Sequence, residues 1–253
     1  RLMCGKSQTG MNLKSDKNTE TQCFASLHDF LTEINENCLL LARHGETDWN
    51  ALNIIQGQED RPLSLKGFEQ RKALFYLLNP VALNRIICST LQRTIQTAAP
   101  LCIEKNIPLE KIAELNEVRL GIYEGQHKEN FTDDLSKKCY QEFLNDEVNV
   151  ILPGGGESLV MADKRIQPFI AELKNSIPRA GHALLVGHRN VNKMIIKNLL
   201  NLSLEQGYQV EHKNAWLYVF APQKAEIFLI KVPALQEPVY VQTGIEKITD
   251  TAS

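Results

Sequence analysis

One short stretch decides the fold of this chain: an apolar run that ends abruptly in charged residues, CLLLARHGETDWN at positions 38–50. Residues 38–42 contain no charged or amide side chain, which is typical of a strand buried on both faces of a parallel sheet. Arg43 and His44 follow at once. Ligands of open α/β sheets bind beyond the carboxyl ends of the strands, so this junction is a candidate functional site.

Two further strands repeat the same pattern. Residues 85–88 are followed by Ser89-Thr90-Leu91-Gln92-Arg93, and residues 182–186 by Gly187-His188-Arg189-Asn190. Helices are predicted over 64–78, 89–105 and 191–200, with Ser64 as an N-cap and Ser89 with Gln92 as a capping box. Strands over 215–220 and 226–231 close the domain. This alternation predicts an α/β fold, a three-layer α/β/α sandwich around a mostly parallel sheet.

The domain organisation follows from where the alternation of strands and helices begins and where it is interrupted. Residues 1–25 are polar and aperiodic, so we expect a flexible N-terminal arm, followed by a short helix over 26–34. Residues 26–253 are expected to form a single domain. The stretch 117–173 contains helical patterns at 132–145 and 157–173 with no strand between them. We interpret it as a helical insertion over the carboxyl edge of the sheet, and thus over the active site.

Composition narrows the classes of function and the partners. The chain has 253 residues and a formal net charge of -2, so no global field attracts it to nucleic acid or to an acidic membrane surface. No apolar run reaches the about 18 residues of a membrane span. The six cysteines contain no CxxC pair, which argues against zinc. Reduced cysteines and a cytoplasmic location are the simplest expectation, although disulfides remain open. A monomer or a homodimer is expected.

The three polar clusters suit one chemistry. If their strands are neighbours, two histidines and at least two arginines lie close together. These residue types are suited to binding a phosphate dianion. Guanidinium groups match phosphate oxygens in pairs, and each such contact is worth roughly 4 kcal/mol at an effective dielectric of about 20. Fixed cations could therefore do the work that magnesium does in many phosphoryl-transfer enzymes, and neither a metal nor another cofactor is expected.

The residues themselves resemble a known family. Residues 41–50 resemble the RHGxTxxN signature of the histidine phosphatase superfamily, in its phosphoglycerate-mutase-like branch. Other segments resemble further family motifs in the same order: Gln56-Gly57 with 62–67 (PLSLKG), Ser89-x-Leu91-x-Arg93-x-x-x-Thr97-Ala98, Leu115-Asn116-Glu117 with Gly121 and 124–125, 156–158 (GES), and Gly187-His188. The resemblance covers about 38–231, nearly the whole expected domain.

The resemblance implies a role for each matched residue. His44 would attack phosphorus and form a phosphohistidine, and Glu117 would protonate the leaving oxygen and later deprotonate water. The residues expected at the catalytic centre are His44, Glu117, His188, Arg43 and Arg93. Those expected to bind substrate are Arg43, Asn50, Gln56, Gly57, Arg93, His188, Arg189 and Asn190. The expected partner is a small-molecule phosphate ester.

Three functions remain open. The expected one is a phosphatase acting on small phosphate monoesters. A metal-independent phosphoglycerate-type mutase is the alternative, but mutases of the family usually place Arg directly after the acid and Tyr two residues further on, where this chain has Val118 and Leu120. A phosphate-binding module without turnover is the third. Arg189 stands where the family commonly has Gly, so it could supply a cation for a second anionic group, narrow the pocket or face solvent.

Overall fold

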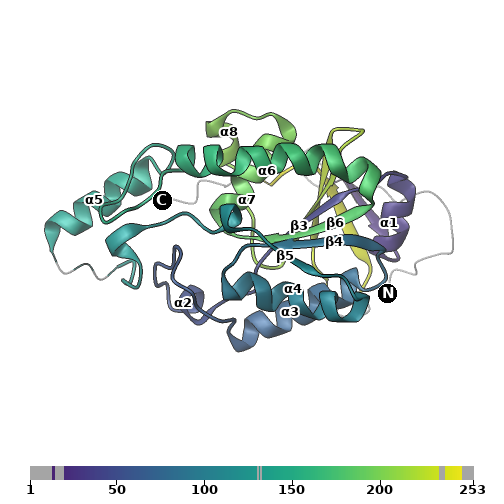
Figure 1. Ribbon diagram of the computed structural model, residues 1–253, viewed down its shortest axis with the longest axis horizontal. Helices are drawn as coiled ribbons and strands as arrows, with labels where there is room; N and C mark the ends of the chain where they lie inside the picture. The colour runs from purple at the N-terminus through teal and green to yellow at the C-terminus, as the bar shows by residue number, and fades with distance from the viewer. Residues whose placement is uncertain (1–12, 15–19, 130, 132, 234–236, 247–253) are drawn as a thin grey trace.

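A computed structural model describes residues 13–14, 20–129, 131, 133–233 and 237–246. Its centre is a nine-stranded mixed sheet in the order β1-β2-β9-β8-β7-β3-β6-β4-β5. Helices cover both faces of this sheet, with α3 and α4 on one side and α6 and α7 on the other (Figure 1). The predicted α/β class and three-layer architecture are confirmed.

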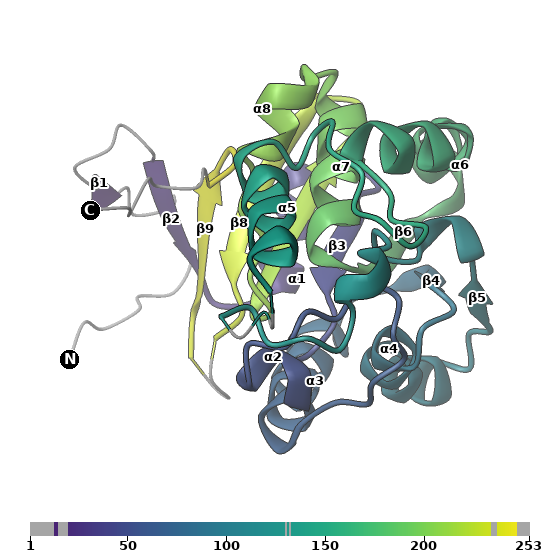
Figure 2. The ribbon, with the colours of Figure 1, turned by 90° about the vertical axis from the view of Figure 1, so that its left-hand side faces the viewer.

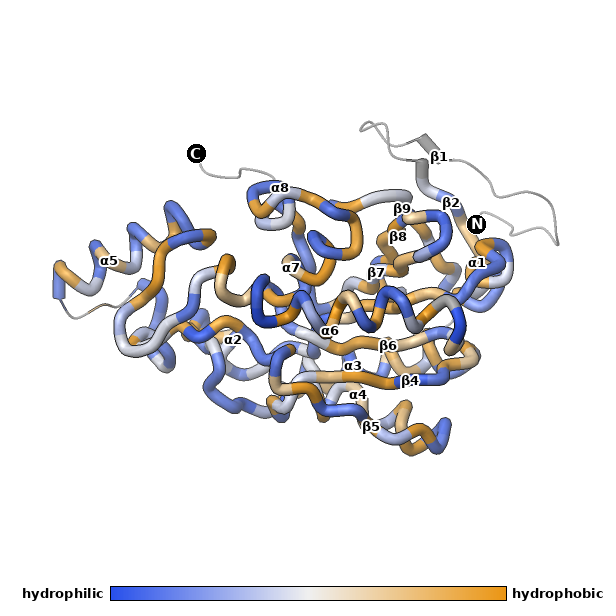
Figure 3. The backbone as a smooth tube through the Cα atoms, turned by 45° about the horizontal axis from the view of Figure 1, so that its top comes forward, coloured by the Kyte–Doolittle hydropathy of each residue, from blue (hydrophilic) through white to orange (hydrophobic). Residues whose placement is uncertain are grey.

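The parallel half of the sheet positions the candidate site. It consists of β3 (Leu39–Arg43), β6 (His182–Gly187), β4 (Leu83–Cys88) and β5 (Leu109–Lys111). Arg43 on β3 pairs with Gly187 on β6, and Cys88 on β4 pairs with Val186. This register brings the carboxyl ends of the three predicted strands to one edge, as the sequence indicates. Figure 3 shows β4 and β6 as largely hydrophobic stretches.

The other half of the sheet is antiparallel. It contains β7 (Trp216–Ala221), β8 (Glu226–Lys231), β9 (Val239–Thr243), β2 (Glu20–Phe24) and β1 (Leu13–Lys14). The expected parallel arrangement therefore holds for the half that carries the site and not for these strands. The predicted arm over 1–25 is wrong for Glu20–Phe24, because β2 pairs with β9 and buries Phe24. Ala25 is an exposed bend after β2, and residues 1–12 and 15–19 of that arm lie outside the described residues.

Two apolar cores separate the layers. On one face, α1 (Leu27–Ile34), α3 (Leu65–Leu78) and α4 (Gln92–Lys105) pack against the sheet. On the other face lie α6 (Leu159–Ala180), α7 (Arg189–Leu200) and α8 (Leu204–Tyr208). The α6 helix continues past Pro168 and past its predicted end at 173, because Leu173 and Ile177 stay buried on its apolar face. Within the described residues, no helix combines the length and apolarity that crossing a membrane requires.

The predicted insertion over 117–173 is wrong for 159–173, because these residues form the first part of α6 and pack against the sheet. The segment between β5 and α6 remains as the insertion. It contains η1 (Ala113–Leu115), η2 (Gly121–Tyr123) and α5 (Asp134–Asn145) and has no strand of its own among the described residues. A small core of its own holds it together, formed by Ile55, Tyr123, Tyr140, Phe143 and Leu152. Figure 2 shows α5 in front of the sheet and beside α7 when the molecule is viewed from the carboxyl ends of the parallel strands. The insertion therefore covers that edge.

Candidate active site

His44 lies directly beyond β3, and His188 lies directly beyond β6. The amide of His44 donates to the carbonyl oxygen of Gly187 at 3.0 Å, so the parallel ladder continues for one residue past β3. The two imidazole centroids are 5.2 Å apart. Strand pairing thus brings together two histidines that are 144 positions apart in the chain, as the sequence predicts.

The His44 ring is neutral and has one free nitrogen. Its Nδ1 lies 2.8 Å from the carbonyl oxygen of Gly45, an acceptor, so the ring proton is on Nδ1 and Nε2 keeps its lone pair. Burial, and then the charges of Arg93 and Arg43, hold the pKa of His44 well below its ordinary value of 6.5. An unprotonated Nε2 at neutral pH is what nucleophilic attack on phosphorus requires.

His188 has protein partners on both ring nitrogens. Arg93 donates from Nε to Nδ1 of His188 at 3.2 Å, and Nε2 of His188 lies 2.7 Å from the Ser89 hydroxyl. Because Arg93 can only donate, the His188 proton is on Nε2 and is donated to Ser89. Burial and the charge of Arg93 lower the pKa of His188 well below 6.5. His188 therefore orients Arg93 beside the His44 ring.

Arg93 and Arg43 place two buried cations at the site. Arg93, in the first turn of α4, donates to the carbonyl oxygens of Gly57 at 2.7 Å and Glu59 at 2.9 Å. Arg43 donates to the carbonyl oxygen of His212 at 3.1 Å, while its buried Nε has no partner. Burial lowers the pKa of each to about 10, so both stay charged at neutral pH.

The predicted residues Asn50, Gln56 and Gly57 form the wall next to Arg93. Asn50 and Thr47 form a capping box at the start of the short helix α2 (Asp48–Ala51). The side-chain oxygen of Gln56, Oε1, accepts from the Thr47 hydroxyl at 2.9 Å. The buried Nε2 of Gln56 has no partner. Gly57 contributes its backbone, at a φ of 52° that favours glycine, and an added Cβ would lie 2.0 Å from Oε1 of Glu124. Gly57 thus holds Arg93 through its carbonyl oxygen, and Gln56 keeps its side-chain NH2 group free.

Glu117 is the acid that reaches the site. Its Oε2 accepts from the amide of Asn190 at 3.2 Å, and its Oε1 accepts from the amides of Val118 and Val191 at 3.0 and 3.3 Å. Its charge raises the pKa of Arg43 and of Arg93, against the effect of their burial. Of the neighbouring acids, Glu114 is exposed, and Glu124 accepts from the amides of Gln58 and Leu120. The structure thus brings Glu117, and not these two, to the start of α7.

The last two predicted residues lie in the first turn of α7. Arg189 is partly exposed. Burial is the main cause that lowers the pKa of Arg43, and the charge of Arg189 is the second. Asn190 gives its amide to Glu117, and its buried Oδ1 has no partner. All the predicted site residues therefore gather at one edge of the sheet.

Four neighbouring residues support the site in ways that the sequence reading did not assign. Asn214 donates to the carbonyl oxygen of His44 at 2.6 Å, His212 holds Arg43 through its carbonyl, and Thr97 accepts from the amide of Gly45 at 3.1 Å. Ser89 holds His188, so the predicted capping box is wrong: α4 begins after Leu91 without a side-chain cap. The resemblance contained Ser89 and Thr97 as motif positions, but no sequence signal singled out Asn214.

The resemblance also implies that Gly45 lets the backbone approach the ligand closely, and the structure gives a different reason for this glycine. A Cβ on Gly45 would lie 2.6 Å from the carbonyl oxygen of Gly67 in α3. The close approach that requires glycine is therefore to this helix and not to a ligand.

Comparison with known proteins places the chain among phosphatases and mutases. The family model of the histidine phosphatase superfamily (branch 1) matches residues 39–232. The adenosylcobalamin/alpha-ribazole phosphatase of Salmonella typhimurium is 31% identical over 164 residues, which are 65% of this chain and 80% of that protein. A protein named probable phosphoglycerate mutase GpmB, from an Enterobacter species, is 31% identical over 64% of this chain and 74% of its own length.

Solved structures agree with the fold. The alpha-ribazole phosphatase from Shigella flexneri superimposes with a TM-score of 0.63 at 26% identity, covering 79% of this chain and 93% of that one. A mycobacterial glucosyl-3-phosphoglycerate phosphatase, solved with VO3, gives a TM-score of 0.64 at 28% identity, covering 73% of this chain and 92% of that one.

Proposed function

The chain belongs to the histidine phosphatase superfamily, and from this we propose that it hydrolyses small-molecule phosphate monoesters through a phosphohistidine at His44. One observation carries the proposal. A neutral His44, with its lone pair on Nε2, lies beside the cations Arg43 and Arg93, whose charges act on it. The phosphatases among the relatives support hydrolysis as the reaction.

Two half-reactions follow from these groups. The first half-reaction starts from Glu117 in its carboxylic acid form. Nε2 of His44 bonds to phosphorus while the bond between phosphorus and the alcohol oxygen breaks, and Glu117 gives its proton to that oxygen. In the second, Glu117 takes a proton from water, the water oxygen bonds to phosphorus, and the bond to His44 breaks. Phosphate leaves, and His44 and Glu117 return to their starting states.

The cations stabilise the charge that develops between these steps. Arg43 and Arg93 would hold the phosphoryl oxygens, with His188 keeping Arg93 in place. The free amide of Gln56 and the side chain of Asn190 offer further polar contacts. Asn50 and Gly57 would shape the phosphate site, and Arg189 would bind the rest of the substrate. Because these groups supply the positive charge, we propose that turnover needs neither a metal nor a cofactor.

A mutase would use the same nucleophile, and one local feature favours the hydrolase. The residue after Glu117 is Val118, which is 1% exposed and packs in the core, so no arginine extends toward substrate from that position. A mutase has to return the phosphate to a bound acid, which calls for additional cations at such positions. A binding module without turnover is disfavoured because the nucleophile, the arginines and the acid are all in place.

Location and assembly complete the proposal. The five described cysteines, Cys23, Cys38, Cys88, Cys102 and Cys139, are free thiols. This agrees with a cytoplasmic enzyme, which we propose acts as a monomer or a homodimer on a small phosphate ester and without nucleic acid.

The direct test is hydrolysis of p-nitrophenyl phosphate in the presence of excess EDTA. We expect turnover at the rate seen without the chelator; loss of turnover, restored by added magnesium, would contradict metal independence. With 3-phosphoglycerate as substrate, release of inorganic phosphate is expected of a phosphatase. Conversion to the 2-isomer without phosphate release would instead establish the mutase.

A further inference from the structure

The motif Gly156-Glu157-Ser158 has no role in the proposed reaction. Ser158 caps α6, because its side chain accepts from the amide of Met161 at 3.4 Å. A Cβ on Gly156 would lie 2.5 Å from the carbonyl oxygen of Leu152, so a close backbone approach requires glycine there. Glu157 is a buried carboxylate, and a buried charge needs a partner.

Glu157 forms a two-point ion pair with Arg165 of α6. The Arg165 guanidinium donates from Nε to Oε1 of Glu157 at 2.9 Å and from Nη2 to Oε2 at 2.7 Å. The side chain of Glu157 is 4% exposed and that of Arg165 is 22% exposed, so water competes little for these contacts. Two parallel bonds fix the orientation of the guanidinium, because its plane matches that of the carboxylate. The third nitrogen of the group, Nη1, therefore points in a fixed direction.

This third nitrogen bonds to the segment that carries Glu117. Nη1 of Arg165 donates to the carbonyl oxygen of Glu114, three residues before Glu117. The backbone amide of Glu157 donates to the carbonyl oxygen of Arg119, two residues after Glu117, at 2.8 Å. The ion pair and the backbone beside it thus hold the segment 114–119 at both ends.

The segment depends on such contacts because it has no regular structure around Glu117. The short helix η1 ends at Leu115, and residues 116–120 belong to neither a helix nor a strand. Leu115 is fully buried, and Gln58 donates from Nε2 to the carbonyl oxygen of Glu117 at 2.7 Å. Without a hydrogen-bonded ladder of its own, this backbone is placed by contacts with other parts of the chain.

Glu117 is held from two helices. Its carboxylate accepts from the amides of Asn190 and Val191 in the first turn of α7. Its backbone segment is held by Arg165 of α6, and both helices lie on the same face of the sheet (Figure 1). The position of the carboxylate relative to the site therefore depends on α6 as well as on α7.

We propose that Arg165 and Glu157 are positioning residues, which place Glu117 for proton transfer to the leaving oxygen. This rests on the proposed function, in which Glu117 is the acid. Both residues act through the backbone of 114–119 and not on the substrate. A misplacement of about 1 Å at a reacting group costs up to about a hundredfold in rate, so we expect about tenfold from loosening this support.

A direct effect of charge is the competing explanation. Arg165 is one of the cations that lower the pKa of His188, after burial and the charges of Arg93, His44 and Arg43. Arg165→Lys separates the two explanations, because lysine keeps the charge but cannot bond to the carboxylate at two points and to the Glu114 carbonyl as well. A role through charge predicts wild-type kinetics for this variant, and a positioning role predicts a defect.

The leaving group shows whether that defect lies in proton transfer. For Arg165→Lys we expect kcat/KM for glycerol 3-phosphate, an alkyl ester, to fall by about tenfold. For p-nitrophenyl phosphate it should fall by less, because p-nitrophenolate leaves without needing a proton. The loss should lie in kcat and not in KM, since the groups that bind the phosphate are unchanged. An equal loss on the two esters, or no loss on either, would overturn the proposal.

Arg85→Lys is the matched control. Arg85 donates to the two carboxylate oxygens of Glu110 at 2.9 and 2.8 Å, and its side chain is also 22% exposed. This variant should keep the wild-type ratio of the two kcat/KM values. If Arg165→Lys does not fold, the double variant Arg165→Met/Glu157→Gln removes both charges together and is expected to show the same selective loss.

Combination with Glu117→Gln tests whether Arg165 acts through Glu117. Adding Arg165→Lys to Glu117→Gln should lower kcat/KM for the alkyl ester by less than twofold further, because the proton transfer that Arg165 supports is already gone. A further tenfold loss would overturn the positioning role. If Glu117→Gln alone slows both esters equally, the proposed acid is wrong. If Glu117→Gln is selective for the alkyl ester and Arg165→Lys is not, only the positioning role is wrong.

Discussion

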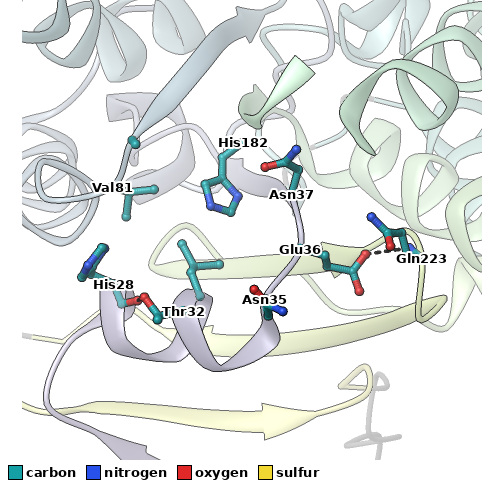
Figure 4. A pocket seen from close by; sticks show the side chains of 10 residues that line it. His28, Thr32, Asn35, Glu36, Asn37, Val81, His182 and Gln223 are labelled. Carbon is teal, nitrogen blue, oxygen red and sulfur yellow. Dashed lines mark hydrogen bonds between the residues drawn. The ribbon is translucent and has the colours of Figure 1, made fainter. Parts of the chain in front are cut away.

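The two ends of the central parallel strands both carry histidines, yet the two environments differ in charge. At the carboxyl ends, His44 and His188 are buried among arginines. At the amino ends, His182 begins β6 and faces His28 of α1 across a groove of about 430 Å³ (Figure 4). The residues that line this groove include the carboxylate of Glu36 and no arginine or lysine.

The two ends also differ in how many of their polar groups already have hydrogen-bond partners. In the groove, His182 accepts the amide of Cys38 at 3.0 Å, and the Glu36 carboxylate accepts the amides of Gln223 and Lys224 at 2.7 and 3.3 Å. At the carboxyl ends, Arg43, Gln56 and Asn190 keep buried atoms unpartnered. The contrast teaches that convergent cations with spare donors, and not open volume, identify the anion site in this fold.

The largest effect is expected from changing one histidine at each end. His44→Ala removes the nucleophile and should lower kcat/KM for p-nitrophenyl phosphate by about a thousandfold or more. His182→Ala removes a ring of the same kind from the opposite end of the sheet and should leave kcat/KM within about twofold of wild type. An equal loss of kcat/KM in the two variants would contradict a functional difference between the two ends of the sheet.

The next effect comes from the geometry of the guanidinium. Arg93→Lys should cost about 2–4 kcal/mol in transition-state stabilisation, because an ammonium cannot contact His188 and two phosphoryl oxygens in one plane. Arg85→Lys is the matched control: Arg85 lies on β4 and pairs with Glu110 at 2.8 Å, away from the site. An unchanged kcat/KM in Arg93→Lys would remove Arg93 from the phosphate site.

Leaving-group protonation gives a smaller and more selective effect. Glu117→Gln keeps the shape of the side chain and removes its proton transfer, so alkyl phosphates should slow by about a hundredfold and aryl phosphates by less. Glu114→Gln, on the same segment but exposed, should match wild type on both. An equal loss on alkyl and aryl esters would argue against Glu117 as the proton donor.

The buried histidines make stability depend on pH. Burial lowers the pKa of His44 and His188 well below 6.5 and that of His212 to about 3. Between those values and 6.5 the unfolded chain binds more protons than the folded one. Stability should therefore be fully present above pH 6.5 and fall as pH drops below it, by up to about 1.4 kcal/mol per pH unit for each histidine.

Urea unfolding at pH 7 and at pH 5 measures this dependence. His212→Asn should unfold with a shallower dependence on pH than the wild type, since one of the three titrating groups is gone. The same slope in both proteins would show that His212 is not among the groups responsible.

The sequence predicts the residues of the site better than it predicts the residues that hold them in place. His44, Arg93 and His188 each follow an apolar strand or begin a helix, so local patterns and strand adjacency suffice to place them. The hydrogen bond from Asn214 to the His44 carbonyl oxygen spans 170 positions, and no pattern in the residues around Asn214 predicts it. The short strands β5 and β9 escape prediction for a similar reason: they are fixed by pairing with β4 and β8, and not by a strong pattern of their own.

The covalent intermediate is the most direct measurement. Rapid acid-free quenching of the wild-type enzyme in turnover with a radiolabelled phosphate ester should trap protein-bound label that is stable to alkali and released by acid. Peptide mapping should place this label on His44, and His44→Ala should show none. Turnover without any trapped label, or label that persists in His44→Ala, would contradict a phosphohistidine at this position.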